Sequence, residues 1–161
     1  MLFRSLENIS TSSGPGVPTP HSSRGLALGD YDNDGDVDVF INNMNETPSL
    51  LRNDSVRAGG FLSLRLIGKE SNRSAIGARV KLELGERTLV QEVRSGSSFM
   101  SSSDLRLHFG LGGTESVEKI QIEWPHRSSK TVLTGVAANQ FLEVTEGEGI
   151  TARKPAAEQS E

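Results

Sequence analysis

Five aspartates fall within nine residues of this chain, in the stretch DYDNDGDVD, which forms a D-x-D-x-D-G-x-x-D pattern. Calcium takes about six to eight oxygen ligands at about 2.3 to 2.6 Å, which alternating carboxylates and one main-chain carbonyl of a tight loop can supply. We therefore predict a calcium site in this stretch. Its expected ligands are the side chains of Asp30, Asp32, Asp34 and Asp38 and the main-chain carbonyl of Asp36.

Gly35 follows the third aspartate and permits the sharp turn that folds a chain around an ion. A solvated acidic turn is the alternative, but five neighbouring carboxylates repel one another unless a cation is present. An EF-hand does not fit, because its twelfth position needs a bidentate glutamate and here is Ile41. Magnesium is less favoured, since it prefers strict octahedral geometry and retained waters. We expect the ion to brace the loop rather than to act on a substrate.

The segments on either side of the aspartates have strand patterns. Leu26 and Leu28 alternate with small residues before the loop, and Val37, Val39 and Ile41 alternate after it. The aspartate loop is therefore expected to join two strands. Residues 1–55 are predicted to form one β unit that resembles a single propeller blade, within which the Ser/Pro/Gly-rich residues 10–25 form a loop that leads into the first strand.

A second β domain is expected over residues 60–147, because short alternating runs follow one another quickly there. Gly85 and Glu86 should form a tight hairpin turn, and Pro125 should end the strand that contains Trp124, a predicted core residue. The fold class is therefore all-β, with an antiparallel sandwich or barrel after the first unit. Residues 148–161 are small and polar and are predicted to be disordered. The expected strands are 61–67, 78–84, 87–93, 105–109, 117–124, 131–133 and 141–144.

Composition excludes several classes of function. The aspartate stretch holds five of the 21 acidic residues, which leaves 16 acids against 17 bases, and no basic stripe suits a nucleic acid. Cysteine is absent, so neither disulfides nor thiolate metal sites are possible. The start of the chain lacks the pattern of a signal peptide. No segment approaches the about 18 apolar residues that span a bilayer, so no membrane insertion is expected.

Longer segments carry a resemblance to a known family. The segment RGLALGDYDNDGDVDVFINN resembles an FG-GAP/VCBS repeat, whose calcium loop would use Asp30, Asp32, Asp34, Asp36 and Asp38 as described above. Three segments, SNRSAIGARV, EVRSGSSFMSSSDLRLHFGLG and VEKIQIEWP, resemble the ASPIC/UnbV domain that follows such repeats in the cartilage acidic protein-like family. The resemblance implies an extracellular, periplasmic or cell-surface location. It also implies that this is the C-terminal part of a larger propeller protein.

These observations favour a calcium-binding, non-catalytic interaction module with a protein or glycan partner. The alternatives are an accessory enzyme of natural-product assembly, a hydrolase, or a glycan-binding module. Little supports catalysis, since His21, His108 and His126 lack metal-ligand spacing and the serine-rich run 95–103 contains no nucleophile elbow. Aromatic content of 5% gives weak support to glycan binding through exposed rings.

Overall fold

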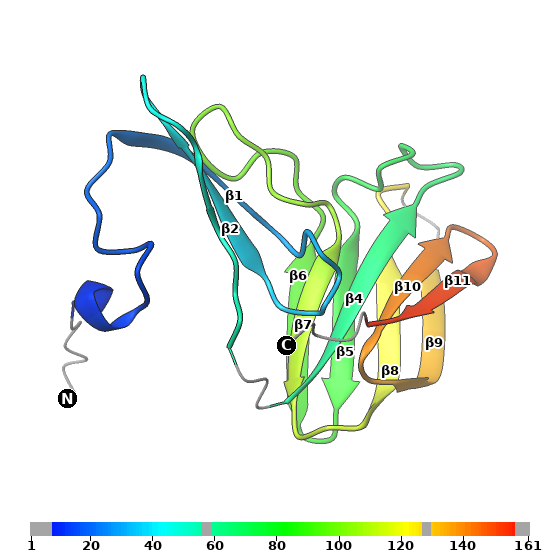
Figure 1. Cartoon of the computed structure of the whole chain (residues 1–161). Helices are drawn as coiled ribbons and strands as arrows, with labels where there is room; N and C mark the ends of the chain where they lie inside the picture. The colour runs from blue at the N-terminus through cyan, green and yellow to red at the C-terminus, as the bar shows by residue number, and fades with distance from the viewer. Residues whose placement is uncertain (1–7, 56–58, 127–129, 157–161) are drawn as a thin grey trace, which may run out of the picture.

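The computed structural model describes residues 8–55, 59–126 and 130–156. This part of the chain is all-β, as the alternating patterns predict, with one short 3-10 helix, η1 (Ser10–Ser12), and three sheets (Figure 1). Within these ranges no helix has the length and apolar character needed to cross a membrane. The predicted unit 1–55 and the predicted tail both extend into residues outside the described ranges.

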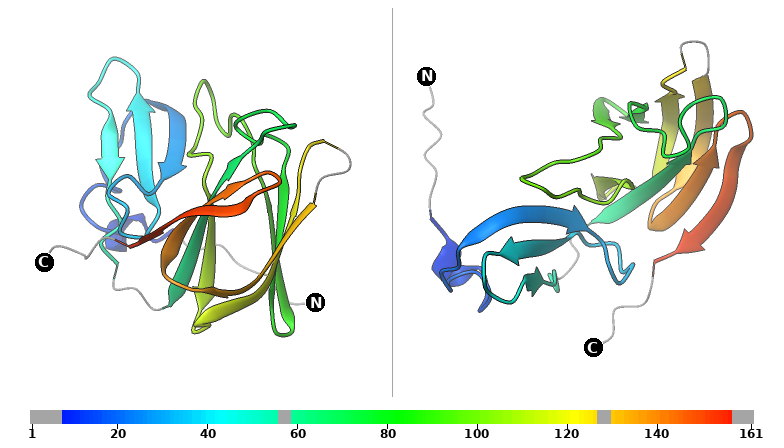
Figure 2. Two further views of the ribbon diagram at one scale, coloured as in Figure 1. Left: turned by 90° about the vertical axis from the view of Figure 1, so that its right-hand side faces the viewer. Right: turned by 90° about the horizontal axis from the view of Figure 1, so that it is seen from above.

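The aspartate stretch belongs to a three-stranded antiparallel sheet formed by β1 (Ser23–Gly29), β2 (Asp38–Asn43) and β3 (Ser49–Leu51). The strands lie in the order β1-β2-β3. Gly29 pairs with Asp38, so the eight residues between them form the loop at one end of the hairpin. This sheet lies beside the rest of the molecule (Figure 2).

The remaining strands form two four-stranded sheets that share one apolar core. Leucines of β4 and β10 pack from one sheet against valines and isoleucines of β5 and β8 from the other, and most of these side chains are fully buried. One sheet has the order β11-β10-β4-β7 and the other β6-β5-β8-β9. The strands are β4 (Gly60–Ile67), β5 (Arg79–Leu84), β6 (Arg87–Glu92), β7 (Leu107–Gly112), β8 (Ser116–Glu123), β9 (Lys130–Ala137), β10 (Gln140–Thr145) and β11 (Gly149–Pro155).

Two local predictions within this sandwich are confirmed, the hairpin turn and the burial of Trp124. Leu84 pairs with Arg87, so Gly85 and Glu86 form a two-residue hairpin loop. β8 ends at Glu123, one residue earlier than predicted, so Trp124 lies between the strand and Pro125. The Trp124 ring is buried, and its indole N–H donates to the Thr131 hydroxyl at 2.9 Å.

One strand pairing differs from the expected antiparallel domain: β10 runs parallel to β4. The cause is a crossing between sheets, since β9 ends in one sheet and β10 begins in the other after Ala138 and Asn139. Asn139 has a positive φ of 58° and anchors this corner to Phe61. Its N–H donates to the Phe61 carbonyl at 2.7 Å, and its side chain accepts from the Phe61 N–H at 3.2 Å.

The predicted disorder of residues 148–161 is wrong for half of that segment, because Gly149–Pro155 forms β11; residues 157–161 lie outside the described ranges. A turn with Gly147 and Gly149 at positive φ reverses the chain, and β11 then pairs antiparallel with β10. Main-chain hydrogen bonds to an existing strand edge do not require an apolar sequence. Thr145 and Thr151 add a hydroxyl contact at 3.0 Å.

Candidate metal centre

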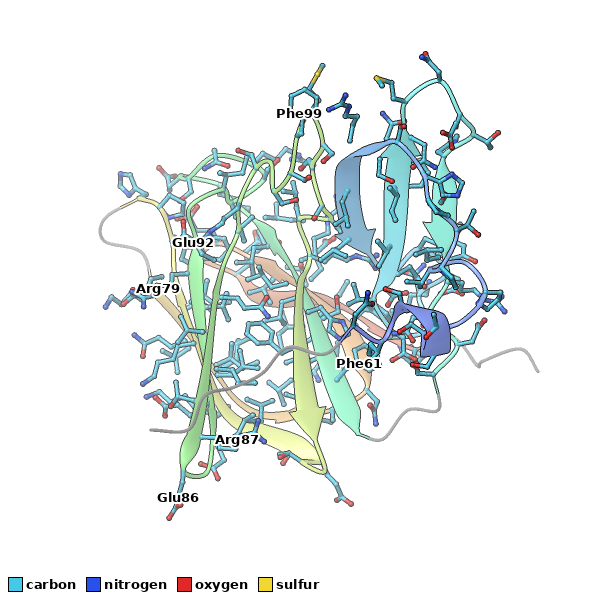
Figure 3. All side chains as sticks on the ribbon, turned by 90° about the vertical axis from the view of Figure 1, so that its left-hand side faces the viewer. Phe61, Arg79, Glu86, Arg87, Glu92 and Phe99 are labelled. Atoms are coloured by element: carbon cyan, nitrogen blue, oxygen red, sulfur yellow. The ribbon has the colours of Figure 1, made fainter. Side chains whose placement is uncertain are left out.

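The aspartate loop turns through two residues with left-handed backbone angles, Asn33 (φ 61°) and Gly35 (φ 98°). Asparagine tolerates this region and glycine adopts it without strain. Gly35 is required for a second reason, because a β-carbon there would lie 2.2 Å from the Phe61 ring. The loop therefore packs closely on β4 of the sandwich. Phe61 lies on the side of the sandwich that faces the three-stranded sheet (Figure 3).

Three of the predicted ligands come together. Asp30, Asp32 and Asp38 each offer a carboxylate oxygen, and the three oxygens lie within 4.8 Å of one another. Asp30 and Asp38 are only 5% and 3% exposed. Three carboxylates at this separation repel one another strongly in a partly dry site, so a bound cation would stabilise the arrangement.

Asp34 and Asp36 are not part of this group of three. Asp34 is buried and its Oδ1 accepts the Asp36 N–H at 2.8 Å, a local bond that holds the turn. The structure thus brings together the first, third and ninth positions of the motif and leaves the fifth and seventh at the turn beside them.

The hydrogen bonds of the three converging carboxylates differ. Asp38 accepts the Tyr31 N–H at 3.1 Å and the Asn53 N–H at 2.9 Å, one on each oxygen. Asp30 accepts the Gly35 N–H at 3.0 Å through Oδ2 only. The Oδ1 atoms of Asp30 and Asp32 are buried and accept no hydrogen bond from the described residues.

The electrostatics of Asp30 agree with this geometry. Burial raises the pKa of its carboxyl above the ordinary value of 3.8, although the Gly35 N–H and the charge of Arg106 act in the opposite direction. A buried carboxylate with an unsatisfied oxygen costs free energy unless it is neutralised. A divalent cation at the three converging oxygens would supply that neutralisation, so the residues fit a metal ion.

Arg106, which the sequence did not single out, ties the aspartate loop to β7. Its Nη1 donates to the Asn33 side chain at 2.6 Å and its Nη2 to the Asp30 carbonyl at 2.5 Å. Its Nε pairs with Asp104, whose Oδ1 also accepts the Arg106 N–H at 3.0 Å. The only sequence signal was an acid and a base two residues apart at the start of a strand. This pattern is too common to predict that Arg106 would bond to the aspartate loop.

The serine-rich run 95–103 is a loop, as predicted, and it contacts the outer edge of β1. The Ser101 hydroxyl donates to the Leu26 carbonyl at 2.8 Å, and the Leu28 N–H donates to the Ser103 hydroxyl at 3.1 Å. The Asp104 N–H then donates to the Leu28 carbonyl at 2.8 Å. This edge is therefore covered by hydrogen bonds from the sandwich, which reduces its capacity to pair with another chain.

The three histidines have separate local partners. His21 Nδ1 lies 2.6 Å from a Glu46 carboxylate oxygen. His108 stacks on Phe61 with ring centroids 5.5 Å apart, and the His126 N–H donates to the Ser71 hydroxyl at 3.2 Å. Across the described ranges, Asp30, Asp32 and Asp38 are the one group of three residues with metal-binding side chains that converges in this way.

Comparison with known families adds one finding. The family model described as ASPIC and UnbV matches residues 68–151, which is more than half of the chain. The match runs from the loop after β4 into β11, so it covers most of the sandwich and leaves the aspartate loop outside. A search of the curated proteins gives no match.

Proposed function

The chain belongs to the ASPIC and UnbV family, and from that premise we propose that it is a calcium-binding, non-catalytic interaction module of an extracellular protein. The observation that carries the calcium part is the convergence of Asp30, Asp32 and Asp38 with two buried oxygens that accept no hydrogen bond from the described residues. Oxygen-only ligands with little regularity suit calcium better than magnesium.

In this proposal Asp30, Asp32 and Asp38 hold the ion through carboxylate oxygens, and Asp34 and the Asp36 carbonyl complete the set. The ion supplies positive charge where buried carboxylates would otherwise repel. Its role is to brace the loop against the sandwich. Support for bracing comes from contacts that the loop makes there: Gly35 packs on Phe61, and Arg106 donates to the Asn33 side chain and the Asp30 carbonyl.

We further propose that residues 23–51 are a repeat of the FG-GAP/VCBS type within a larger propeller. The three strands and the calcium-loop pattern between the first two support this assignment. So does the apolar surface of the sheet, where Phe40 and Leu50 pair across β2 and β3 and are about half exposed. A neighbouring repeat would cover such a surface.

Calorimetric titration of the chain with calcium tests the metal site. We expect saturable binding that is tighter than binding of magnesium. Asp32→Ala should weaken it at least about tenfold, or about 1.4 kcal/mol, whereas Asp36→Ala should have a much smaller effect because that residue offers its main-chain carbonyl. Equal losses in the two variants, or no saturable heat with the wild type, would contradict the proposed coordination.

A further inference from the structure

A group of charged and aromatic side chains shares the outer face of the sheet β11-β10-β4-β7, next to the aspartate loop. Ser63 pairs with Phe141 and Arg65 with Glu143 across β4 and β10, and Phe141 pairs with Lys154 across β10 and β11. Paired residues on neighbouring strands project to the same face. Leu62, Leu64 and Leu142 alternate with them and are buried in the core, so the face with Arg65 is the outer one.

A cavity of about 230 Å³ lies over this face. Four basic residues line it, Arg65, Arg106, Arg153 and Lys154, together with the Phe141 ring and one acid, Glu143. The charged lining therefore carries four positive charges against one negative. This local excess of positive charge is notable in a chain with a net charge of −4.

Three of these four cations form no ion pair among the residues that the structure describes. Arg106 is engaged by Asp104 and Asn33. Arg65, Arg153 and Lys154, by contrast, form no ion pair with any residue in the ranges 8–55, 59–126 and 130–156. Protection of an edge strand against aggregation is an alternative role for lysine and arginine, and it would account for Arg153 and Lys154 on β11. It does not account for Arg65, because β4 lies between β10 and β7.

From this cavity we infer that the protein binds an acidic sugar residue, a pyranose that carries a carboxylate or a sulfate. Its anionic group would pair with Arg65, Arg153 and Lys154, as charge-assisted bonds favour. Glu143 would accept hydrogen bonds from sugar hydroxyls, and Phe141 offers apolar surface to a ring C–H face. A bare phosphate is less suited, because it has neither the hydroxyls that could donate to Glu143 nor an apolar face that could pack on Phe141. The volume suits one such residue rather than a drug-sized ligand.

This inference rests on the proposed interaction role but not on calcium. None of the three converging carboxylates lines the cavity, although Asn33 of the same loop does. The two proposals can therefore fail separately. Calcium binding without sugar binding would overturn only the inference, and the reverse result would overturn only the calcium site.

The test is calorimetric titration of the full chain with a galacturonic acid oligosaccharide, in chelator and at about 0.15 M salt, where long-range attraction is screened. Saturable binding is expected, and the methyl-esterified oligosaccharide should bind at least about tenfold more weakly because charge-assisted bonds are lost. Arg65→Gln should weaken binding of the acid form to a similar degree. The double variant Arg153→Gln/Lys154→Gln should do so as well.

The matched control is Arg73→Gln/Arg87→Gln, which removes two exposed cations outside the cavity. Arg87 lies at the end of the β5–β6 hairpin, beside Glu86 (Figure 3). The control should leave affinity within about twofold, since remote charges are screened. Equal weakening by control and cavity variants, absence of saturable binding, or equal affinity for polyglutamate or inorganic phosphate would overturn the inference. If loss of the β11 cations causes aggregation, Arg65→Gln still decides the question.

Discussion

Asp30 in the aspartate loop and Asp38 at the start of β2 are buried carboxylates that differ in their hydrogen bonds. Asp38 bonds to the N–H groups of Tyr31 and Asn53, so it holds the base of the loop by itself. Asp30 and Asp32 each have one buried oxygen that accepts no hydrogen bond from the described part of the chain. We therefore expect removal of the ion to leave Asp38 in place. The destabilisation caused by removal of the ion should be concentrated at Asp30 and Asp32, whose buried oxygens would then lack a partner.

Asp30→Asn should separate stability from metal binding. The folded-state pKa of Asp30 is raised, so its carboxyl contributes stability below the ordinary pKa of 3.8 and loses that contribution as pH rises through the raised value. In metal-free buffer near neutral pH the variant should therefore melt at the same or a higher temperature than the wild type. In excess calcium the wild type should melt at a higher temperature than the variant. Thermal unfolding in both buffers measures this, and a variant that is less stable without metal would contradict it.

Gly35→Ala should destabilise the loop by about 1 to 3 kcal/mol, since a residue with a β-carbon is strained at positive φ and would also clash. The clash is with Phe61, whose ring lies 2.2 Å from the position of that β-carbon. Gly113→Ala is the matched control, because no atom lies within 4 Å of its added carbon. Chemical denaturation of both variants checks the prediction. Similar losses would mean that the loop does not depend on this close contact.

The elements with regular alternation were predictable from the sequence. Local apolar patterns and turn residues suffice to identify β4 to β10 and the Gly85-Glu86 hairpin. The direction of β10 was not predictable, because it depends on which sheet the chain enters after Asn139. β11 was missed for a related reason: its polar residues gain order from main-chain pairing with β10 rather than from burial. The contacts of Arg106 likewise depend on tertiary placement.

β11 should matter for stability despite its polar sequence. A chain that ends at Glu148 loses six strand pairings and the packing of Ile150 against the core. Partial burial of one isoleucine alone is worth about 1 kcal/mol, so the truncated chain should be destabilised by at least that amount. It should also self-associate, because the edge of β10 becomes free. A chain that ends at Ala156 is the control. Denaturation and sedimentation of the two chains make the comparison, and identical behaviour would show that β11 is dispensable.

At the scale of the molecule, the two parts of the structure differ in what holds them together. The buried apolar cluster draws all its members from residues 62–144, with Ile150 packed against it, and none from the three-stranded sheet. That sheet depends instead on its own strand pairings and on contacts with the sandwich. These contacts come from Arg106, Phe61 and the loop that contains Ser101 and Ser103. A unit with few buried apolar contacts opens more readily than one with a closed core.

A fragment of residues 59–156 should therefore fold without the first sheet. It retains every strand of the sandwich, including β11, and the whole apolar cluster. We expect a cooperative thermal transition and a β-type circular dichroism spectrum. Addition of calcium should not change its melting temperature, because the fragment lacks Asp30, Asp32 and Asp38. A random-coil spectrum would be the contrary result.

In the full chain, calcium should protect the three-stranded sheet selectively. An ion that binds only the closed loop stabilises it by RT ln(1 + [L]/Kd), about 2.7 kcal/mol at a hundredfold excess over Kd, so exchange of amides in that sheet should slow about a hundredfold. The Asp104 amide should respond too, although it belongs to the sandwich, because it donates to the Leu28 carbonyl of β1. Amides of β8, which belongs to the sheet without β4 and β7, should not respond. Hydrogen exchange with and without chelator distinguishes these cases, and uniform protection of β1 and β8 would mean that calcium acts on the whole fold rather than on this interface.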